Sequence, residues 1–173
     1  ALIVTIFVST KSPNIDQRPL KPTEFDYAFK TVKITLLQNE KEVWTLLADD
    51  ALIYTKTKSF LLNKPKGLYQ SSPEKNSNKI NFSSPTGFYN FAEGQLKLVE
   101  TSATLSIDQT IYYLTCDELQ IDTSNQWVSS YGNIQINTAK LSLSGAQLTA
   151  DLNTKKIILS QNINGTIISS TTN

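Results

Sequence analysis

The side chains that could do chemistry in this chain are two pairs of adjacent acids, Asp49-Asp50 and Asp117-Glu118. Glycoside hydrolases use two carboxylates that flank the glycosidic bond to be cleaved. Adjacent residues of a strand point to opposite faces of a sheet, so neither pair predicts such a dyad by itself. Both pairs occupy the same place in a repeated sequence pattern, which indicates a solvated turn or bend. A catalytic or calcium-binding role is the minor alternative, because a calcium loop has a denser pattern of Asp, Asn and Gly.

Cys116 is the other reactive side chain, and the sequence predicts that it is buried and inert. It lies in an apolar segment that begins at Ile111. The chain has no histidine, so no imidazole can activate a thiol or bind a metal ion. The sequence also lacks a P-loop, a GxSxG motif and a GxGxxG motif. It therefore predicts a protein that is not an enzyme and that uses no metal ion or cofactor.

The composition favours a single all-β protein. Ser, Thr and Asn account for 52 of the 173 residues, and they favour strands and polar turns over helices. A hydrophobic content of 39% with a net charge of +1 is too apolar for a typical disordered chain. The same near-zero charge argues against nucleic acid as a partner, because nucleic-acid-binding domains are strongly basic.

Apolar and polar residues alternate with a period of two along much of the chain. This pattern predicts the strands that must position these side chains. It is clearest at Ala103–Ile107, Asn133–Thr138 and Leu141–Gly145. Four stretches of similar layout begin near residues 48, 84, 116 and 145, at intervals of 36, 32 and 29 residues. Each stretch holds two strands and a turn, and a lone hairpin cannot bury its own apolar face. The repeats therefore predict an elongated, twisted β-jellyroll, in which two facing antiparallel sheets enclose an apolar interior and leave strand edges open at the ends.

The chain divides into four predicted segments. Residues 1–8 (ALIVTIFV) are either a buried first strand or the remnant of a membrane anchor, since a complete span takes about 20 residues. Residues 9–23 carry three prolines and predict an extended linker. Residues 24–168 form the predicted β-jellyroll domain, in which Ser71–Asn78 reads as a long hairpin loop or, alternatively, a domain boundary, and residues 169–173 form a tail. An apolar run, a linker and a β-domain in this order favour the anchor interpretation and a tethered extracytoplasmic protein.

The interior of the predicted jellyroll is the candidate binding site. Its lining is taken from the apolar side of each local alternation, and a slip of one residue would turn a whole strand inside out. The clustered aromatic residues Phe88, Tyr89 and Phe91 are interpreted as packing, because a stacking platform for sugars or bases needs polar neighbours on the same face. The predicted lining residues are Leu46, Ile53, Phe82, Tyr89, Phe91, Leu105, Ile107, Leu114, Ile121, Ile134, Ile136, Leu143 and Leu148.

Two segments resemble the LptC family of periplasmic lipopolysaccharide-export proteins. They are W-x-L-x-A-D-x-A at Trp44–Ala51 and LSLSGAQLTAD at Leu141–Asp151. The resemblance covers roughly residues 25–165 and extends to the anchor and linker that precede them. It implies an OstA-like β-jellyroll without catalytic residues. It also implies a location at the periplasmic face of the inner membrane, held by a single-pass anchor.

The resemblance implies a ligand and partners as well. Proteins of this family receive lipopolysaccharide from the inner-membrane LptB–LptF–LptG transporter, hold its acyl chains in an apolar lumen and pass it to periplasmic LptA. A family glycine near the C-terminal end of the roll matters for this handover, and Gly145 matches it. A second family glycine has no match, because this chain reads Asn39-Glu40-Lys41-Glu42 at that place.

Docking to LptA is predicted at the C-terminal edge, since an open strand edge can add a strand from a partner. The N-terminal edge around Thr31–Leu36 is the other candidate for docking. Two further functions remain open. One is a structural or surface β-sandwich domain with no lipid role, and the other is a glycan-acting enzyme, which would need converging carboxylates. The predicted docking residues are Gly145, where a close backbone approach is expected, and Lys156, Ile157, Ile158, Leu159 and Ser160.

Overall fold

The computed structural model describes residues 3–8, 25–38, 41–70, 78–107 and 109–167. Every regular element in these ranges is a β-strand, which confirms the prediction of an all-β chain. None of the described segments is a helix that could cross a membrane. The strands are β1 (Ile3–Val8), β2 (Tyr27–Gln38), β3 (Lys41–Tyr54), β4 (Ser59–Asn63), β5 (Lys66–Gln70), β6 (Lys79–Ser83), β7 (Thr86–Asn90), β8 (Gln95–Ile107), β9 (Thr110–Asp122), β10 (Trp127–Asn137), β11 (Leu141–Asp151), β12 (Lys156–Ser160) and β13 (Asn164–Ile167).

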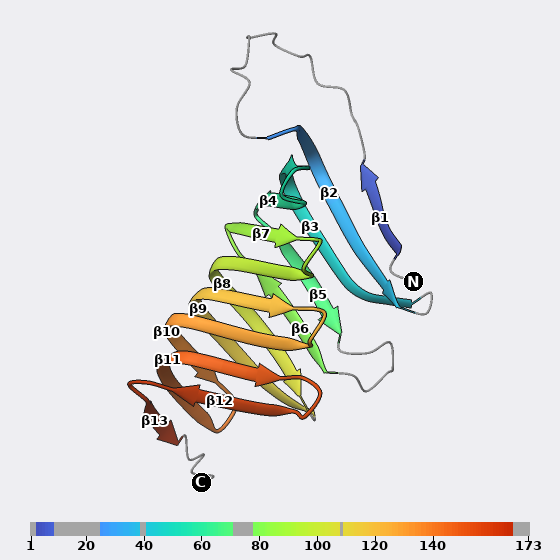
Figure 1. Ribbon diagram of the computed structural model, residues 1–173. Helices are drawn as coiled ribbons and strands as arrows, with labels where there is room; N and C mark the ends of the chain where they lie inside the picture. Colours follow the sequence, from blue (N-terminus) through green and yellow to red (C-terminus); the bar gives the residue numbers. More distant parts are fainter. Residues whose placement is uncertain (1–2, 9–24, 39–40, 71–77, 108, 168–173) are drawn as a thin grey trace.

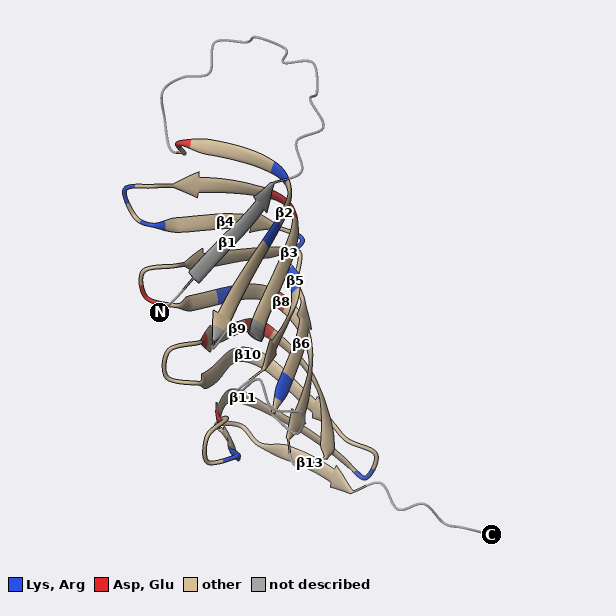
Figure 2. Cartoon of the chain, turned by 90° about the vertical axis from the view of Figure 1, so that its right-hand side faces the viewer, with Lys and Arg blue, Asp and Glu red and all other residues tan. Residues whose placement is uncertain are grey.

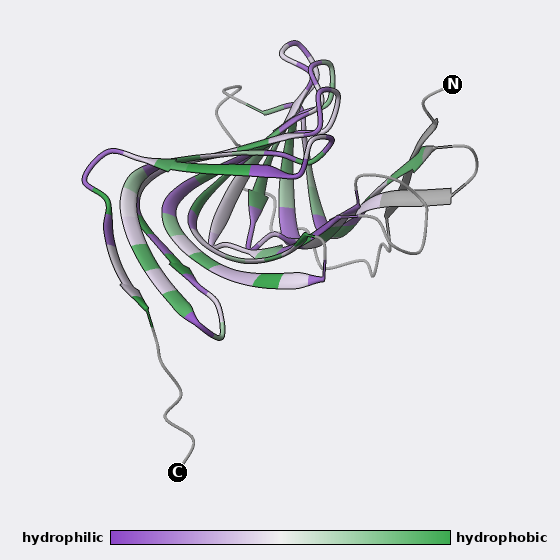
Figure 3. Cartoon of the chain, turned by 90° about the horizontal axis from the view of Figure 1, so that it is seen from below, coloured by the Kyte–Doolittle hydropathy of each residue, from purple (hydrophilic) through white to green (hydrophobic). Residues whose placement is uncertain are grey.

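The strands form one antiparallel sheet that is folded over on itself (Figure 1). Its order is β1-β2-β3-β4-β7-β8-β9-β10-β11-β12, and β5, β6 and β13 pair beside this path. Long strands contribute to both halves, as β3 pairs with β5 through Trp44–Leu47 and with β4 through Asp50–Tyr54. Seen from below, the long strands curve through a U whose arms face each other (Figure 3). The predicted jellyroll is confirmed, and its two facing layers are continuous with each other through the long strands.

We call the half of the sheet that contains β4, β7 and β12 layer one, and the half that contains β1, β5, β6 and β13 layer two. The fold line between them, the crease, crosses the long strands near their middles. Thr31, Glu100 and Gly132 lie on it with φ angles of 53°, 51° and 87°, and the strand pairing skips residues at the same places. At Thr31 and Glu100 one residue on each strand is skipped and the register is kept. At Gly132 the register shifts by one residue, as in a bulge, which bends a strand and re-aims its side chains. At Gly132 a side chain would also overlap the Asp117 carboxylate, so glycine suits this position.

The acidic pairs lie on the crease, which agrees with the bend predicted for them. Ala48 and Ala51, on either side of Asp49-Asp50, are both buried. The alternation of buried and exposed residues therefore shifts by one position between Ala48 and Ala51, and both acids lie outside the interior. The expectation that neighbouring acids point to opposite faces is wrong here, because the bend interrupts the alternation. Asp117-Glu118 repeats the arrangement on β9.

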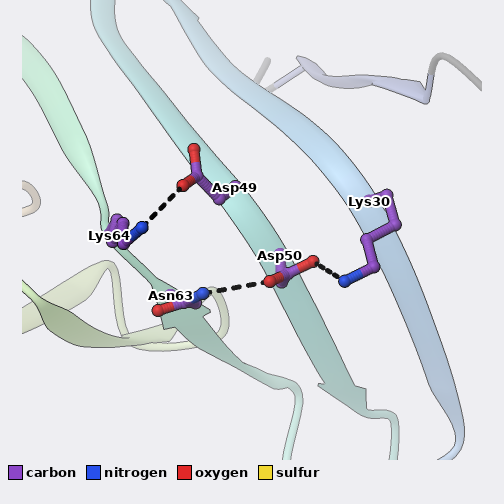
Figure 4. Close-up of polar contacts among 5 residues, drawn as sticks. All are labelled: Lys30, Asp49, Asp50, Asn63 and Lys64. Atoms are coloured by element: carbon purple, nitrogen blue, oxygen red, sulfur yellow. Dashed lines mark hydrogen bonds and ion pairs between the residues drawn. The ribbon is translucent and has the colours of Figure 1, made fainter.

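The first acidic pair is held by two lysines and an amide (Figure 4). Lys64 Nζ lies 3.6 Å from Asp49 Oδ2, and Lys30 Nζ lies 2.5 Å from Asp50 Oδ1. Asn63 Nδ2 donates a hydrogen bond to Asp50 Oδ2 at 3.0 Å. The hydrogen bond from Lys30 is the main reason why the pKa of Asp50 lies below its ordinary value. These contacts tie β2, β3 and β4 together at the crease, so the pair has a structural role.

The N-terminal segment enters the sheet as an edge strand. Ile3–Val8 forms β1, which pairs antiparallel with Val32–Leu37 of β2. The structure thus describes a strand here, and an origin from a membrane anchor stays a prediction. The predicted linker (9–23), the predicted tail (169–173) and loop residues 71–77 lie outside the described residues.

Candidate functional site

Two rows of inward-facing residues run along the folded sheet, one on each layer. Members of a row are register partners on neighbouring strands, so they lie side by side. On layer one the row is Ile53, Phe60, Tyr89, Leu96, Ile121, Val128, Ala150 and Ile157. On layer two the row is Ile34, Leu46, Gly67, Phe82, Ala103, Leu114, Ile136, Leu143 and Gly165. The interior is therefore apolar over nearly the whole length of the domain.

The structure places all thirteen predicted lining residues in this interior. Ten of them are fully buried, with exposed fractions of 0–5%. The other three, Ile53, Phe91 and Leu143, are half-buried and pack against the same core. Their contact with a lipid stays a prediction.

Several large interior side chains were missed by the sequence reasoning. Trp44 and Tyr69 are buried in layer two, and Phe60 and Leu62 are buried in layer one. Part of the signal for Trp44 was available, because Trp44, Leu46 and Ala48 occupy alternate positions, but the apolar residue Leu47, which the structure exposes, obscures the pattern. Leu96 and Leu98 of β8 show the same alternation and are also buried.

An aromatic cluster joins the two layers near their N-terminal end. The ring centroids of Trp44 in layer two and Tyr89 in layer one are 4.6 Å apart. Phe60 lies 6.3 Å from Tyr89 and 5.3 Å from Phe91, measured between ring centroids. Burial raises the pKa of Tyr69 and of Tyr89 to about 12, so both phenols are neutral at physiological pH. Among the described atoms, Trp44 Nε1 has no hydrogen-bond partner.

Cys116 sits in the interior next to the crease, which confirms the prediction of a buried thiol. Burial raises its pKa, although the nearby Ser130 hydroxyl acts in the opposite direction. A thiol with a raised pKa is a poor nucleophile. Within the described ranges, no group of three or more His, Cys, Asp or Glu side chains could hold a metal ion. The interior therefore offers mainly apolar contact.

On the side of the domain opposite the crease, which we call the seam, a hydrogen bond joins the two layers. Asn78 stands just before β6 in layer two, and Leu152 stands just after β11 in layer one. Asn78 Nδ2 donates a hydrogen bond to the Leu152 carbonyl oxygen at 2.7 Å, and both residues are buried. This bond joins the layers across the seam.

The C-terminal end of the interior is framed by β12 and β13. Each pairs with β11 and, within the described part of the chain, with no other strand. Lys156–Ser160, predicted as the docking edge, is thus an edge strand. Ile157 and Leu159 are half-buried against the core, whereas Ile158, Ile163 and Ile167 are exposed. Apolar side chains therefore reach the solvent at this end.

Gly145 lies one strand inside this edge, on β11 opposite Ile134 of β10. A Cβ at Gly145 would meet three atoms of the Leu159 side chain first, the nearest at 2.8 Å. The expectation of a close backbone approach is wrong, because a side chain from β12 occupies the space. Gly145 lets Leu159 fold inward over β11.

Comparisons with known proteins agree with this architecture. The family model for lipopolysaccharide-assembly, LptC-related proteins matches residues 1–168. No curated protein matches the sequence at a significant level. A similar solved structure is LptH from Pseudomonas aeruginosa, described as the LptA homologous periplasmic component of the conserved lipopolysaccharide transport device. It is 10% identical, the alignment covers 73% of this chain and 95% of that one, and the TM-score of 0.58 shows a shared fold. From the family match, the chain belongs to the LptC family of lipopolysaccharide-assembly proteins, and its role is in lipopolysaccharide transport.

Proposed function

We propose that the chain receives lipopolysaccharide from the LptB–LptF–LptG transporter at the periplasmic face of the inner membrane and passes it to LptA. The observation that carries the proposal is the pair of facing apolar rows along the folded sheet. Burial of apolar surface stabilises a complex by about 25 cal/mol per Å². Long acyl chains between the rows would therefore bind firmly without polar contacts. A membrane anchor at the N-terminus would hold the domain beside the transporter.

Entry of the lipid requires the two layers to separate. The interior side chains are packed against one another, and the aromatic pair Trp44 and Tyr89 bridges the layers. The crease is continuous backbone, so it can act as a hinge but cannot open. The seam is joined by the Asn78–Leu152 bond and by side-chain packing. Acyl chains would therefore enter from the seam.

Handover would take place at the C-terminal end. The edge strands β12 and β13 present backbone groups that a strand of LptA could pair with. The exposed residues Ile163 and Ile167 would then be covered by the partner, and the apolar interiors of the two proteins would be continuous. Lipid could move between them without crossing water.

A photocrosslinking experiment tests the proposed interior site. The crosslinker replaces Phe91 or Ile107, which lie on the inner side of layers one and two. The control position is Thr104, which lies between the buried Ala103 and Leu105 and points to the outer face. Lipopolysaccharide should label the two interior positions and leave Thr104 unlabelled. Equal labelling at all three positions, or labelling at none, would reject the proposal and favour a structural domain with no lipid role.

A further inference from the structure

The interior contains a hydrogen-bond donor that its apolar rows do not explain. The Trp44 side chain is 1% exposed, and its indole N–H group has no hydrogen-bond partner in the part of the protein that the structure describes. A buried donor without a partner has lost its bonds to water and gained none in return, so most buried Trp N–H groups are paired. The exception at Trp44 therefore calls for an explanation. A ligand that brings an acceptor into the interior would supply one.

Trp44 lies away from the crease, toward the seam. It stands four residues before Ala48, which flanks the crease on the same strand, and this separation corresponds to about 13 Å along β3. Register partners continue its row to Tyr69 of β5 and Ile80 of β6. Ile80 comes two residues after Asn78, whose hydrogen bond joins the two layers at the seam. The row that contains Trp44 is therefore the row of layer two that lies next to the seam bond.

The facing wall of layer one holds the indole ring from the other side. Tyr89 lies 4.6 Å from Trp44 and 6.3 Å from Phe60, measured between ring centroids. Tyr89 is the last but one residue of β7, and Phe60 is the second residue of β4, so both lie toward the strand ends that are away from the crease. A lipid that enters from the seam has its acyl chains inside and its head group outside, and the boundary between them falls at these rings. Aromatic side chains with a polar tip suit such a boundary.

The interior meets a polar part of a ligand with neutral groups and not with charges. None of the residues in the two facing rows, or in the row of Trp44, is charged. Charged residues are spread over turns and strands rather than gathered in one place (Figure 2). An indole N–H group donates a hydrogen bond and cannot accept one. It therefore fits a group that only accepts, such as the carbonyl oxygen of an ester or an amide.

We propose that the Trp44 N–H group donates a hydrogen bond to the carbonyl oxygen that joins an acyl chain of the bound lipid to its head group. This inference rests on the proposed function, which places the acyl chains in the interior. The layers separate when lipid enters, so the contact between Trp44 and Tyr89 opens and a carbonyl group takes the place beside the indole. From there the acyl chain continues toward the crease, past apolar residues such as Leu46. The hydrogen bond sets the depth of the lipid and selects ester-linked or amide-linked chains over ether-linked ones.

Replacement of the N–H group alone tests the proposal. The variant Trp44→3-benzothienylalanine keeps the two fused rings and has a sulfur atom in place of the N–H group. The probes are dimyristoylphosphatidylglycerol and its di-O-tetradecyl ether analogue, in which CH₂ groups replace the two carbonyl groups. The parent protein should bind the ester lipid about tenfold more tightly than the ether lipid, as expected for one buried hydrogen bond. The Trp44 variant should bind both lipids with the same affinity.

The matched control is the same replacement at Trp127, which is the other tryptophan of the chain and is 44% exposed. This variant should keep the preference of the parent for the ester lipid. The indole N–H signals of the two tryptophans in a proton–nitrogen NMR spectrum give a second measurement. The Trp44 proton signal should move downfield when the ester lipid binds, and it should not do so with the ether lipid. The Trp127 signal should stay in place with both lipids.

Several results would overturn the hydrogen bond: no binding of either lipid, equal affinities for the two lipids in the parent, an ester preference that survives in the Trp44 variant, or a Trp44 signal that does not move. Lower stability of the Trp44 variant in urea unfolding would also count against it, because removal of an unpartnered donor should not destabilise the fold. If the hydrogen bond is rejected while lipopolysaccharide still labels Ile107, the proposed function stands. If Trp44 carries the ester preference and Ile107 stays unlabelled by lipopolysaccharide, the hydrogen bond stands and the proposed function is rejected.

Discussion

Leu159 folds over Gly145, and the two residues come from adjacent strands at the C-terminal end of the sheet. A Cβ on Gly145 would stand 2.8 Å from Leu159 Cδ1. Leu159 belongs to the edge strand β12, whereas Gly145 lies on β11. Any side chain at position 145 therefore acts on the edge strand through Leu159. This contact links the glycine to the edge where handover is proposed.

Gly145→Arg should abolish transfer of lipopolysaccharide to LptA while the domain stays folded. The arginine would displace Leu159 and thereby shift β12. The domain stays folded, because β12 is an edge strand and few other contacts are lost there. Transfer can be followed by passage of crosslinkable lipid to LptA in a reconstituted system, with circular dichroism to check folding. Gly145→Ala combined with Leu159→Ala removes the clash and should retain transfer. Normal transfer by the folded Gly145→Arg variant would contradict this role of the contact.

Ile158→Pro should weaken binding of LptA. Ile158 lies in the edge strand and pairs with Thr149 of β11. Proline removes a backbone donor and distorts the strand, so an added partner strand loses its template. Ile158→Ala is the control, since it removes the exposed side chain and keeps the N–H group. A pull-down against LptA measures both variants. If Ile158→Pro is folded and binds as the parent does, docking at the C-terminal edge is rejected. The predicted alternative around Thr31–Leu36 is wrong as an open edge, because β1 pairs with Val32–Leu37. Docking would then fall to β1, the strand at the N-terminal edge of the sheet.

Alternation predicted the interior well wherever a strand stayed in one layer. Ala103, Leu105 and Ile107 are examples, as all three are buried. The crease could not be predicted in this way. Along β8 the alternation of buried residues shifts by one position between Leu98 and Thr101. In a single sequence such a shift cannot be distinguished from one irregular residue. The backbone preferences of single residues did not indicate the crease either, because a β-branched residue such as Thr31 rarely adopts a positive φ. The surrounding sheet imposes that conformation.

The outer face of layer one shows a second limit of sequence reasoning. The sequence predicts packing for Phe88, yet this residue is exposed beside Lys97 and Gln120. The polar neighbours that a stacking platform requires come from β8 and β9, across the sheet rather than along the chain. Only the strand register brings them to one face. A single sequence shows alternation within a strand but does not give the register between strands.

Alkaline pH should destabilise the protein through Tyr69 and Tyr89. Burial raises the pKa of each from 10 to about 12. The unfolded chain loses these protons first, so the contribution to stability is fully present below pH 10 and is lost as the pH rises through 12. In this pH range each tyrosine lowers the free energy of unfolding by at most about 1.4 kcal/mol per pH unit. Urea unfolding at a series of pH values should show a flatter profile for the Tyr69→Phe, Tyr89→Phe double variant. A profile unchanged by the double substitution would mean that neither phenol drives the effect.

Asn78→Ala should make the domain less stable and lipid uptake faster. The substitution removes the buried hydrogen bond to the Leu152 carbonyl, which joins the two layers at the seam. Loss of a buried partner costs about 1–3 kcal/mol, and the same loss lowers the barrier to separation of the layers. Urea unfolding measures the first effect, and the rate of lipid labelling at Ile107 measures the second. Asn81→Ala, on the exposed face of β6, is the matched control and should change neither. A destabilised Asn78→Ala variant that takes up lipid no faster than the parent would show that the seam is not the route of entry.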